Sequence, residues 1–222
     1  DKARGKDVVA LGAIFQQSPL VLLTRDDIGI DTIADLKNRR IMLTEDAKAT
    51  ASIMAMLFSN GMTENDIQLL AHSFDLEDLV NKKTDAMAAY ISNEPIRLMD
   101  RNIGYKVFSP KDYGFHFYSD LLFSSSDFID NNPKLTKAFY DATIKGWEYA
   151  FDNISQTAEI IEKHYNSQNK SLIHHIKECE MLKRLDYHEN GTIGYLEDYK
   201  LNDIVKVYKV LGLITEDVDL NS

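Results

Sequence analysis

The sequence is short of the residues on which several protein classes depend. Its 222 residues include one cysteine, four prolines and ten glycines. A single thiol, Cys179, excludes a scaffold held together by internal disulfides. No apolar run approaches the ~20 residues needed to span a bilayer, so no membrane-spanning helix is expected. The hydrophobic content of 44% excludes a disordered chain, because it is enough for a sizeable core.

Positive charge is also scarce. The chain has 25 Lys and Arg against 35 Asp and Glu, which gives a net charge of −10 at pH 7. Without a dense basic stripe, nucleic acid is not an expected partner. The first six residues are polar and predict no signal peptide, which leaves a cytoplasmic protein, a mature secreted protein and an excised piece all open.

Known nucleotide-binding and hydrolase motifs are missing as well. The sequence contains no G-x-S-x-G, no G-x-x-x-x-G-K-[ST] and no G-x-G-x-x-G, so no catalytic residue and no cofactor is predicted. His174, His175, Glu178 and Cys179 have a superficial likeness to metal ligands. A structural zinc site needs four ligands with characteristic spacing, so we favour a helix with exposed histidines and predict no metal.

Short apolar runs alternate with helix patterns over the first 124 residues. Strands are predicted at 8–15, 20–24, 41–43, 67–70, 86–91, 106–108 and 115–124, and helices at 31–36, 47–60, 76–81 and 96–101. Further helices are predicted at 133–151, 154–165, 172–182 and 196–211, with no strand between them. The order favours an α/β fold that carries a helical C-terminal segment.

Polar and aromatic side chains follow several of the predicted strands. In open α/β sheets, ligands bind beyond the carboxyl ends of strands, so these loops supply the candidate ligand-binding residues. They are Gln17, Ser18, Thr44, Asp46, Asn93, Glu94, Tyr113, Phe115, His116 and Tyr118. Taken singly, each has a structural explanation, such as helix capping or aromatic packing. Together they describe a polar and aromatic cleft suited to a small heterocycle.

Three segments in this order resemble the thiamine-pyrimidine-synthase-like family: Phe15–Leu22, Asp35–Leu43 and Ala89–Pro95. The tail from Ile193 to Ile214 is similar to the last helix of that family. Its bacterial members are periplasmic substrate-binding proteins for thiamine pyrimidines, and sulfonate and taurine binders are their relatives.

The resemblance implies a fold. The family has the type II periplasmic-binding (Venus flytrap) architecture, in which two α/β lobes are joined by crossover strands and enclose a ligand cleft. Mapped onto this chain, residues 1–24 plus 119–222 form lobe 1, and residues 25–118 form lobe 2 with the crossover segments. Family members carry about half a lobe before the first matching segment, so the N-terminal half-lobe is expected to be missing. An incomplete lobe 1 predicts an exposed sheet edge and a dimer formed through that lobe.

The resemblance also implies a function. It predicts an extracytoplasmic (periplasmic) solute-binding protein or sensor domain for a small polar heterocycle similar to a thiamine-precursor pyrimidine. Glu94, with Asn93 beside it, would accept from an exocyclic amine, and one of the aromatic residues would stack on the ring. The implied partners are the ligand and either an ABC permease or a membrane signalling domain of its own chain. A sulfonate would instead need an arginine, for which Arg25 and Arg97 are the candidates.

Two alternatives remain. Fungal relatives make the thiamine pyrimidine with an active-site histidine, iron and a cysteine-rich motif. This chain has one cysteine and offers only His116 as a cleft histidine, so an enzyme is not expected. The second alternative is an interaction module that binds no small molecule.

Overall fold

The computed structural model describes residue 2, residues 5–216 and residue 218, and its chain divides into two compact units. Unit 1 contains the residues up to Ser18, Phe117–Val205, and the residues from Ile214 onward. Unit 2 contains Pro19–His116 and Lys206–Leu213. The sequence predicts that lobe 2 runs from residue 25 to residue 118, and this division stays a prediction. Unit 2 begins at Pro19, and its first segment ends at His116.

A mixed five-stranded sheet forms the centre of unit 2. Its strand order is β4-β3-β5-β2-β6, with β3 parallel to β4 and β5, and β2 antiparallel to β5 and β6. The strands are β2 (Leu20–Arg25), β3 (Arg40–Leu43), β4 (Gln68–Ala71), β5 (Ala86–Tyr90) and β6 (Tyr105–Phe108). Helices α1 (Ala51–Ser59), α2 (Glu77–Val80) and α3 (Glu94–Asp100) connect them. Because β2 lies between β5 and β6, it belongs with this unit.

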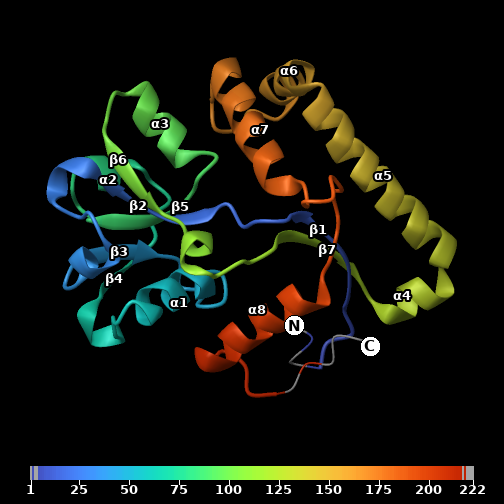
Figure 1. Cartoon of the computed structure of the whole chain (residues 1–222). Coiled ribbons are helices and arrows are strands. Elements are labelled where there is room, and N and C mark those ends of the chain that lie inside the picture. The colour runs from blue at the N-terminus through green and yellow to red at the C-terminus, as the bar shows by residue number, and fades with distance from the viewer. Residues whose placement is uncertain (1, 3–4, 217, 219–222) are drawn as a thin grey trace. The chain divides into compact units, whose positions relative to one another are not determined.

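Each face of this sheet buries its own hydrophobic core. Successive strand residues point to opposite faces, so Leu22 joins one core and Leu23 the other. The first core also contains Ile53 of α1, whereas the second contains Leu79 of α2 and Leu98 of α3. Figure 1 shows α1 on one side of the strands and α2 and α3 on the other. Both faces are therefore covered, as expected of an α/β sheet with parallel strands.

A polar clamp ties β3 to the start of β5. The carboxylate of Asp85 accepts from the backbone N of Arg40 at 2.9 Å and from its Nη2 at 2.7 Å. The Arg40 guanidinium holds the pKa of Asp85 below its ordinary value. Thr24 of β2 donates its hydroxyl to the Asp85 carbonyl at 2.7 Å. Three strands of the sheet thus meet at one residue.

Unit 1 combines a small sheet with most of the helices. Strands β1 (Val9–Phe15) and β7 (Ser119–Ser124) form an antiparallel pair. Helices α4 (Ser126–Asn131), α5 (Pro133–Asp152), α6 (Ile154–His164) and α7 (Leu172–Asp186) follow. The ring of Phe15 meets Trp147 of α5 edge-on at 5.7 Å, which packs the end of β1 against that helix. In Figure 1, α6 and α7 lie side by side.

A glycine in the left-handed backbone conformation lies at the contact between this sheet and α5. Gly194 has φ +81°, and a Cβ there would lie 2.5 Å from Ile144 Cδ1 and 2.6 Å from Tyr140 Oη. Its carbonyl oxygen would lie 2.7 Å from a Cβ built on Gly12 of β1. Both positions therefore need glycine, one for its conformation and both for the close approach.

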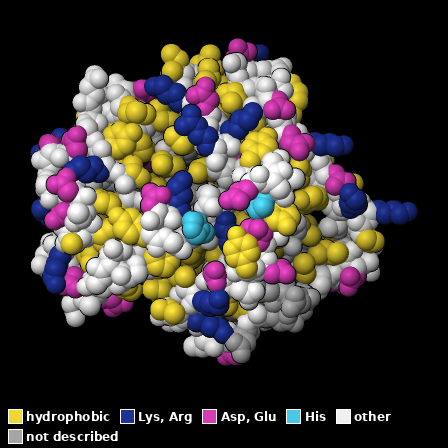
Figure 2. Space-filling model, in the orientation of Figure 1, with side chains coloured by type: hydrophobic (Ala, Val, Ile, Leu, Met, Phe, Trp, Pro, Cys, Tyr) yellow, Lys and Arg dark blue, Asp and Glu magenta, His cyan; other side chains and the backbone are white. Residues whose placement is uncertain are grey.

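The predicted order of elements is confirmed, with adjusted boundaries. Helix α1 begins at Ala51 after a series of turns, α7 continues to Asp186, and β7 begins at Ser119. Helix α4 was not predicted. The last helix, α8 (Asp198–Val210), starts in unit 1, and its residues from Lys206 belong to unit 2. No helix in the described part of the chain has the length and apolar character to cross a membrane. Acidic and basic side chains are interspersed on the face seen in Figure 2.

Candidate functional site

The carboxyl ends of β3 and β5 define the candidate site in unit 2. These strands are parallel neighbours, and β4, which follows β3 in sequence, pairs on the other side of β3. The chain therefore leaves β3 and β5 at a point where the strand order reverses, which is where ligands of such sheets bind. Thr44 follows β3, and Asn93 and Glu94 follow β5. The sheet brings these three predicted residues to one edge.

Thr44 presents an unused polar group at this edge. Its hydroxyl oxygen is buried and has no hydrogen-bond partner among the described residues. A buried hydroxyl without a partner costs free energy, and such groups are few in native proteins. The Thr44 hydroxyl can both donate and accept one hydrogen bond, so it is ready to bind a polar atom of a ligand.

Glu94 is held in a fixed orientation at the start of α3. Its Oε2 accepts from the backbone N of Tyr90 at 2.9 Å, and its Oε1 accepts from Nδ2 of Asn93 at 2.7 Å. A carboxylate offers about four acceptor positions, so both oxygens can still accept from a ligand. The Asn93 amide therefore acts on the carboxylate and orients it.

The other predicted residues of unit 2 have mainly structural contacts. Asp46 is exposed, and its Oδ1 accepts from the backbone N of Lys48 at 3.0 Å, as a turn residue does. Phe115 packs against the first core of the sheet. Tyr113 is 37% exposed at the end of a short 3-10 turn, and His116 is exposed. Whether any of them contacts a ligand stays a prediction.

In unit 1, the predicted residues Gln17, Ser18 and Tyr118 lie near the end of β1. The backbone N of Gln17 donates to Leu185 O at 3.1 Å, and that of Ser18 donates to Phe117 O at 2.8 Å. Tyr118 is 8% exposed, and its hydroxyl accepts from Glu197 N at 2.9 Å. Burial raises the pKa of Tyr118 to about 12, so it stays protonated.

Three buried polar residues that the sequence reasoning missed surround this point. Gln16 donates its amide to Ala13 O and Tyr195 O, but its Oε1 has no partner among the residues described. Lys200 donates to the carbonyl of Gln16, and its Nζ lies 4.0 Å from the centre of the Tyr118 ring. This cation covers one face of the ring that was predicted to stack on a ligand.

The third residue, Asp186, is the most unusual of the group. It has no exposed surface, and neither carboxylate oxygen has a hydrogen-bond partner within the described part of the chain. Burial raises the pKa of Asp186 to about 8, and the nearby carboxylate of Asp120 adds to the effect. Burial also lowers the pKa of Lys200 to about 8. Gln16 was the only one of the three beside a predicted residue; nothing in the sequence marked the other two.

Metal ligands do not assemble in the described part of the chain: no group of three His, Cys, Asp or Glu side chains there could hold an ion. His174 and His175 are buried on α7, which corrects the prediction of exposed histidines. Helix α7 packs against α6.

Comparison with known proteins shows which family this chain is similar to. A family model described as NMT1/THI5 like matches residues 1–156, which is most of the chain. The chain belongs to the NMT1/THI5-like family. The resemblance predicted from the strand-end segments is thereby confirmed.

Individual relatives are more distant. The chain is 26% identical over 202 residues to a formylaminopyrimidine-binding protein of Halalkalibacterium halodurans, covering 86% of this chain and 60% of that protein. The fold is similar to the periplasmic aliphatic sulphonate-binding protein SsuA of Escherichia coli, with TM-score 0.74, 15% identity, and coverage of 99% of this chain and 69% of that one. It is also similar to the desulfurization enzyme DSZB, with TM-score 0.64, 13% identity, and coverage of 97% and 76%. These likenesses confirm the α/β periplasmic-binding-protein fold, and the chain spans about 60% of the length of the curated relative.

Proposed function

We propose that this chain binds a small polar heterocycle bearing an amine, at the carboxyl edge of the unit 2 sheet, as an extracytoplasmic solute-binding protein. The observation that carries the proposal is the unpartnered buried hydroxyl of Thr44 at the edge where Glu94 is held in place. The two groups offer a combined donor and acceptor at the same sheet edge as a pure acceptor. An aminopyrimidine, with ring nitrogens and N–H groups, complements that pair.

The named relatives support this ligand class without deciding it. The curated relative is described as binding formylaminopyrimidine, a heterocycle of the proposed chemistry. The structural neighbour SsuA is described as binding aliphatic sulphonates, which are anions. A free cationic group at the site would strengthen the binding of such an anion.

The arginines of unit 2 favour the heterocycle. Arg25 is occupied, since its Nε and Nη2 each lie 2.8 Å from the carboxylate of Asp27, and its Nη1 donates to Val80 O at 3.2 Å. Arg97 has no ion pair among the described residues and stands as the one candidate for a sulfonate. It lies on α3 three residues after Glu94, whose carboxylate would repel an anion at short range.

The wider setting is part of the proposal. A binding protein of this kind delivers its ligand to an ABC permease; a sensor head on a membrane signalling chain is the alternative. An enzyme is the less favoured alternative, since the one histidine predicted for catalysis, His116, is exposed. Exposed Leu121 and Phe123 on β7 support the proposed dimer through unit 1.

Calorimetric titration of the chain with formylaminopyrimidine, and separately with an alkylsulfonate, tests the proposal. Heat is expected with the pyrimidine. Thr44→Val and Glu94→Gln should each weaken binding by about 1–3 kcal/mol, because each removes a hydrogen bond to a partly buried group. Glu159→Gln, which removes an exposed carboxylate from α6, is the matched control. Unchanged affinity in both site variants, or heat with the sulfonate alone, contradicts the proposal.

A further inference from the structure

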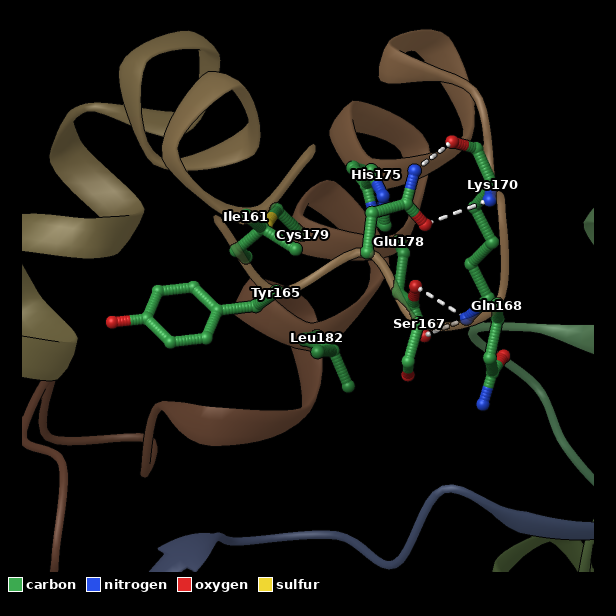
Figure 3. A pocket seen from close by; sticks show the side chains of 10 residues that line it. Ile161, Tyr165, Ser167, Gln168, Lys170, His175, Glu178, Cys179 and Leu182 are labelled. Carbon is green, nitrogen blue, oxygen red and sulfur yellow. Dashed lines mark hydrogen bonds and ion pairs between the residues drawn. The ribbon is translucent and has the colours of Figure 1, made fainter. Parts of the chain in front are cut away.

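A pocket lies entirely within unit 1. It has a volume of about 220 Å³ and is formed by the end of α6, the segment 165–170 and α7. Figure 3 shows the lining side chains, with the ring of Tyr165 pointing away from the ion pair of Lys170 and Glu178. A dry cavity of roughly 150 Å³ is enough to take up benzene, so this pocket has room for one substituted ring.

One residue that lines the pocket, His175, carries an unused polar atom. His175 is 6% exposed, and its Nε2 is buried with no hydrogen-bond partner in the part of the chain that the structure describes. An imidazole nitrogen can donate or accept according to its tautomer, so a hydroxyl or an amine can pair with it. Leaving such an atom unpaired is costly, so a hydroxyl or amine that reaches it from the pocket gains a hydrogen bond.

Apolar side chains make up the surface beside His175. Ile161 of α6 and Leu182 of α7 line the pocket, and Cys179 follows His175 by one helical turn on the same face. Burial raises the pKa of the Cys179 thiol, which therefore remains protonated and behaves as a small apolar group. A ring placed here would pack against all three.

The charged groups of the lining cancel each other. Nζ of Lys170 lies 3.0 Å from Oε2 and 3.3 Å from Oε1 of Glu178. Nε2 of His174 lies 3.8 Å from the same carboxylate, outside hydrogen-bond distance. An ionic ligand would lose its hydration in the pocket and find no free opposite charge to pair with. The lining therefore favours a neutral molecule.

The pocket is also shaped before any ligand arrives. The side chain of Asn166 donates to Lys170 O at 2.7 Å and accepts from Lys170 N at 2.8 Å, which closes the connecting segment on itself. Ser171 then caps α7 by accepting from His174 N at 3.2 Å. Binding needs little reordering of the chain, which favours affinity for a small molecule.

We propose that this pocket is a second binding site, for a small neutral ring compound with one hydrogen-bonding group. That group pairs with Nε2 of His175, and the ring packs against Ile161, Cys179 and Leu182. The site uses no residue of the proposed pyrimidine site, so the two proposals stand or fall separately.

Phenol and toluene form the test pair, because they have nearly the same size and differ by one hydroxyl. Each is titrated into the full chain while the methyl signals of Ile161 and Leu182 are followed by NMR. Phenol is expected to bind about tenfold more tightly than toluene, since only phenol satisfies the buried nitrogen. Equal affinity of the two compounds, or no shift of these methyl signals with phenol, overturns the proposal.

Two variants sharpen the result. His175→Leu should remove the preference for phenol and leave toluene binding intact. His164→Leu makes the same change at an exposed position on α6 and should keep the preference. If circular dichroism shows that His175→Leu does not fold, the comparison of phenol with toluene on the unmodified chain still decides. Retention of the full preference in a folded His175→Leu variant overturns the role given to Nε2.

Discussion

Replacement of Asp186 by Asn should change how the stability of the chain depends on pH. The pKa of Asp186 is raised from its ordinary 3.8 to about 8 by burial. Between these values the folded chain holds a proton that the unfolded chain has released. The free energy of unfolding therefore falls as pH rises, by at most about 1.4 kcal/mol per pH unit. From about pH 5 to about pH 7 the loss reaches about 2.7 kcal/mol.

Asparagine has nearly the same shape and does not ionise, so the Asp186→Asn variant should lack this slope. Its stability relative to the unmodified chain should increase steadily from about pH 5 to about pH 7. The range stops there because Asp186 itself begins to ionise in the folded chain as the pH approaches its pKa of about 8. The slope of the unmodified chain then levels off.

Urea unfolding at several pH values, followed by circular dichroism, measures this difference. Asp130→Asn is the matched control, because Asp130 is an exposed carboxylate in the same unit. Its stability profile should stay parallel to that of the unmodified chain. A constant offset between Asp186→Asn and the unmodified chain, whatever its sign, refutes the reasoning, since a fixed packing cost of the amide has no pH dependence.

Two further substitutions test the packing and the clamp. Gly194→Ala should destabilise the chain by about 2 kcal/mol or more, because the added Cβ would meet Tyr140 and the backbone has φ +81°. Thermal unfolding measures the loss of stability, and an unchanged midpoint contradicts the close approach. Asp85→Asn should remove stability that is present above about pH 4, since the pKa of Asp85 is lowered by Arg40 and the contribution is lost as pH falls through the folded value. Acid unfolding curves that coincide near pH 7 and differ only below about pH 4 would show this prediction wrong.

The fold could be predicted because its signals are local. The run from Leu20 to Thr24 has the continuous apolar character of a strand with both faces covered, and the structure places β2 between two neighbours with a core on each side. The edge that carries Thr44 and Glu94 followed from strand ends alone. Helix starts were less certain: the turns before α1 include Asp46, whose side chain accepts a turn hydrogen bond that competes with helical pairing.

Roles of aromatic residues could not be predicted in the same way. Tyr118 and Phe115 lie three positions apart in one loop, and the sequence offered both as rings to stack on a ligand. The structure packs Phe115 against the core of unit 2 and buries Tyr118 beneath Lys200 in unit 1. The partners that decide this, above all Lys200, come from a distant part of the chain. No local pattern records such contacts.

Asp186 shows what a sequence hides most completely. The predicted helix ends at Leu182, and a carboxylate in the last turn of a longer helix is unfavourable beside the negative end of the helix dipole. Helix α7 nevertheless runs to Asp186 and buries it where Leu185 O accepts from Gln17 N of the segment after β1. The penalty of burial and the penalty of the dipole act in the same direction. Both penalties are relieved when the carboxylate takes up a proton. The titration of Asp186 is therefore the measurement that reports on this part of unit 1.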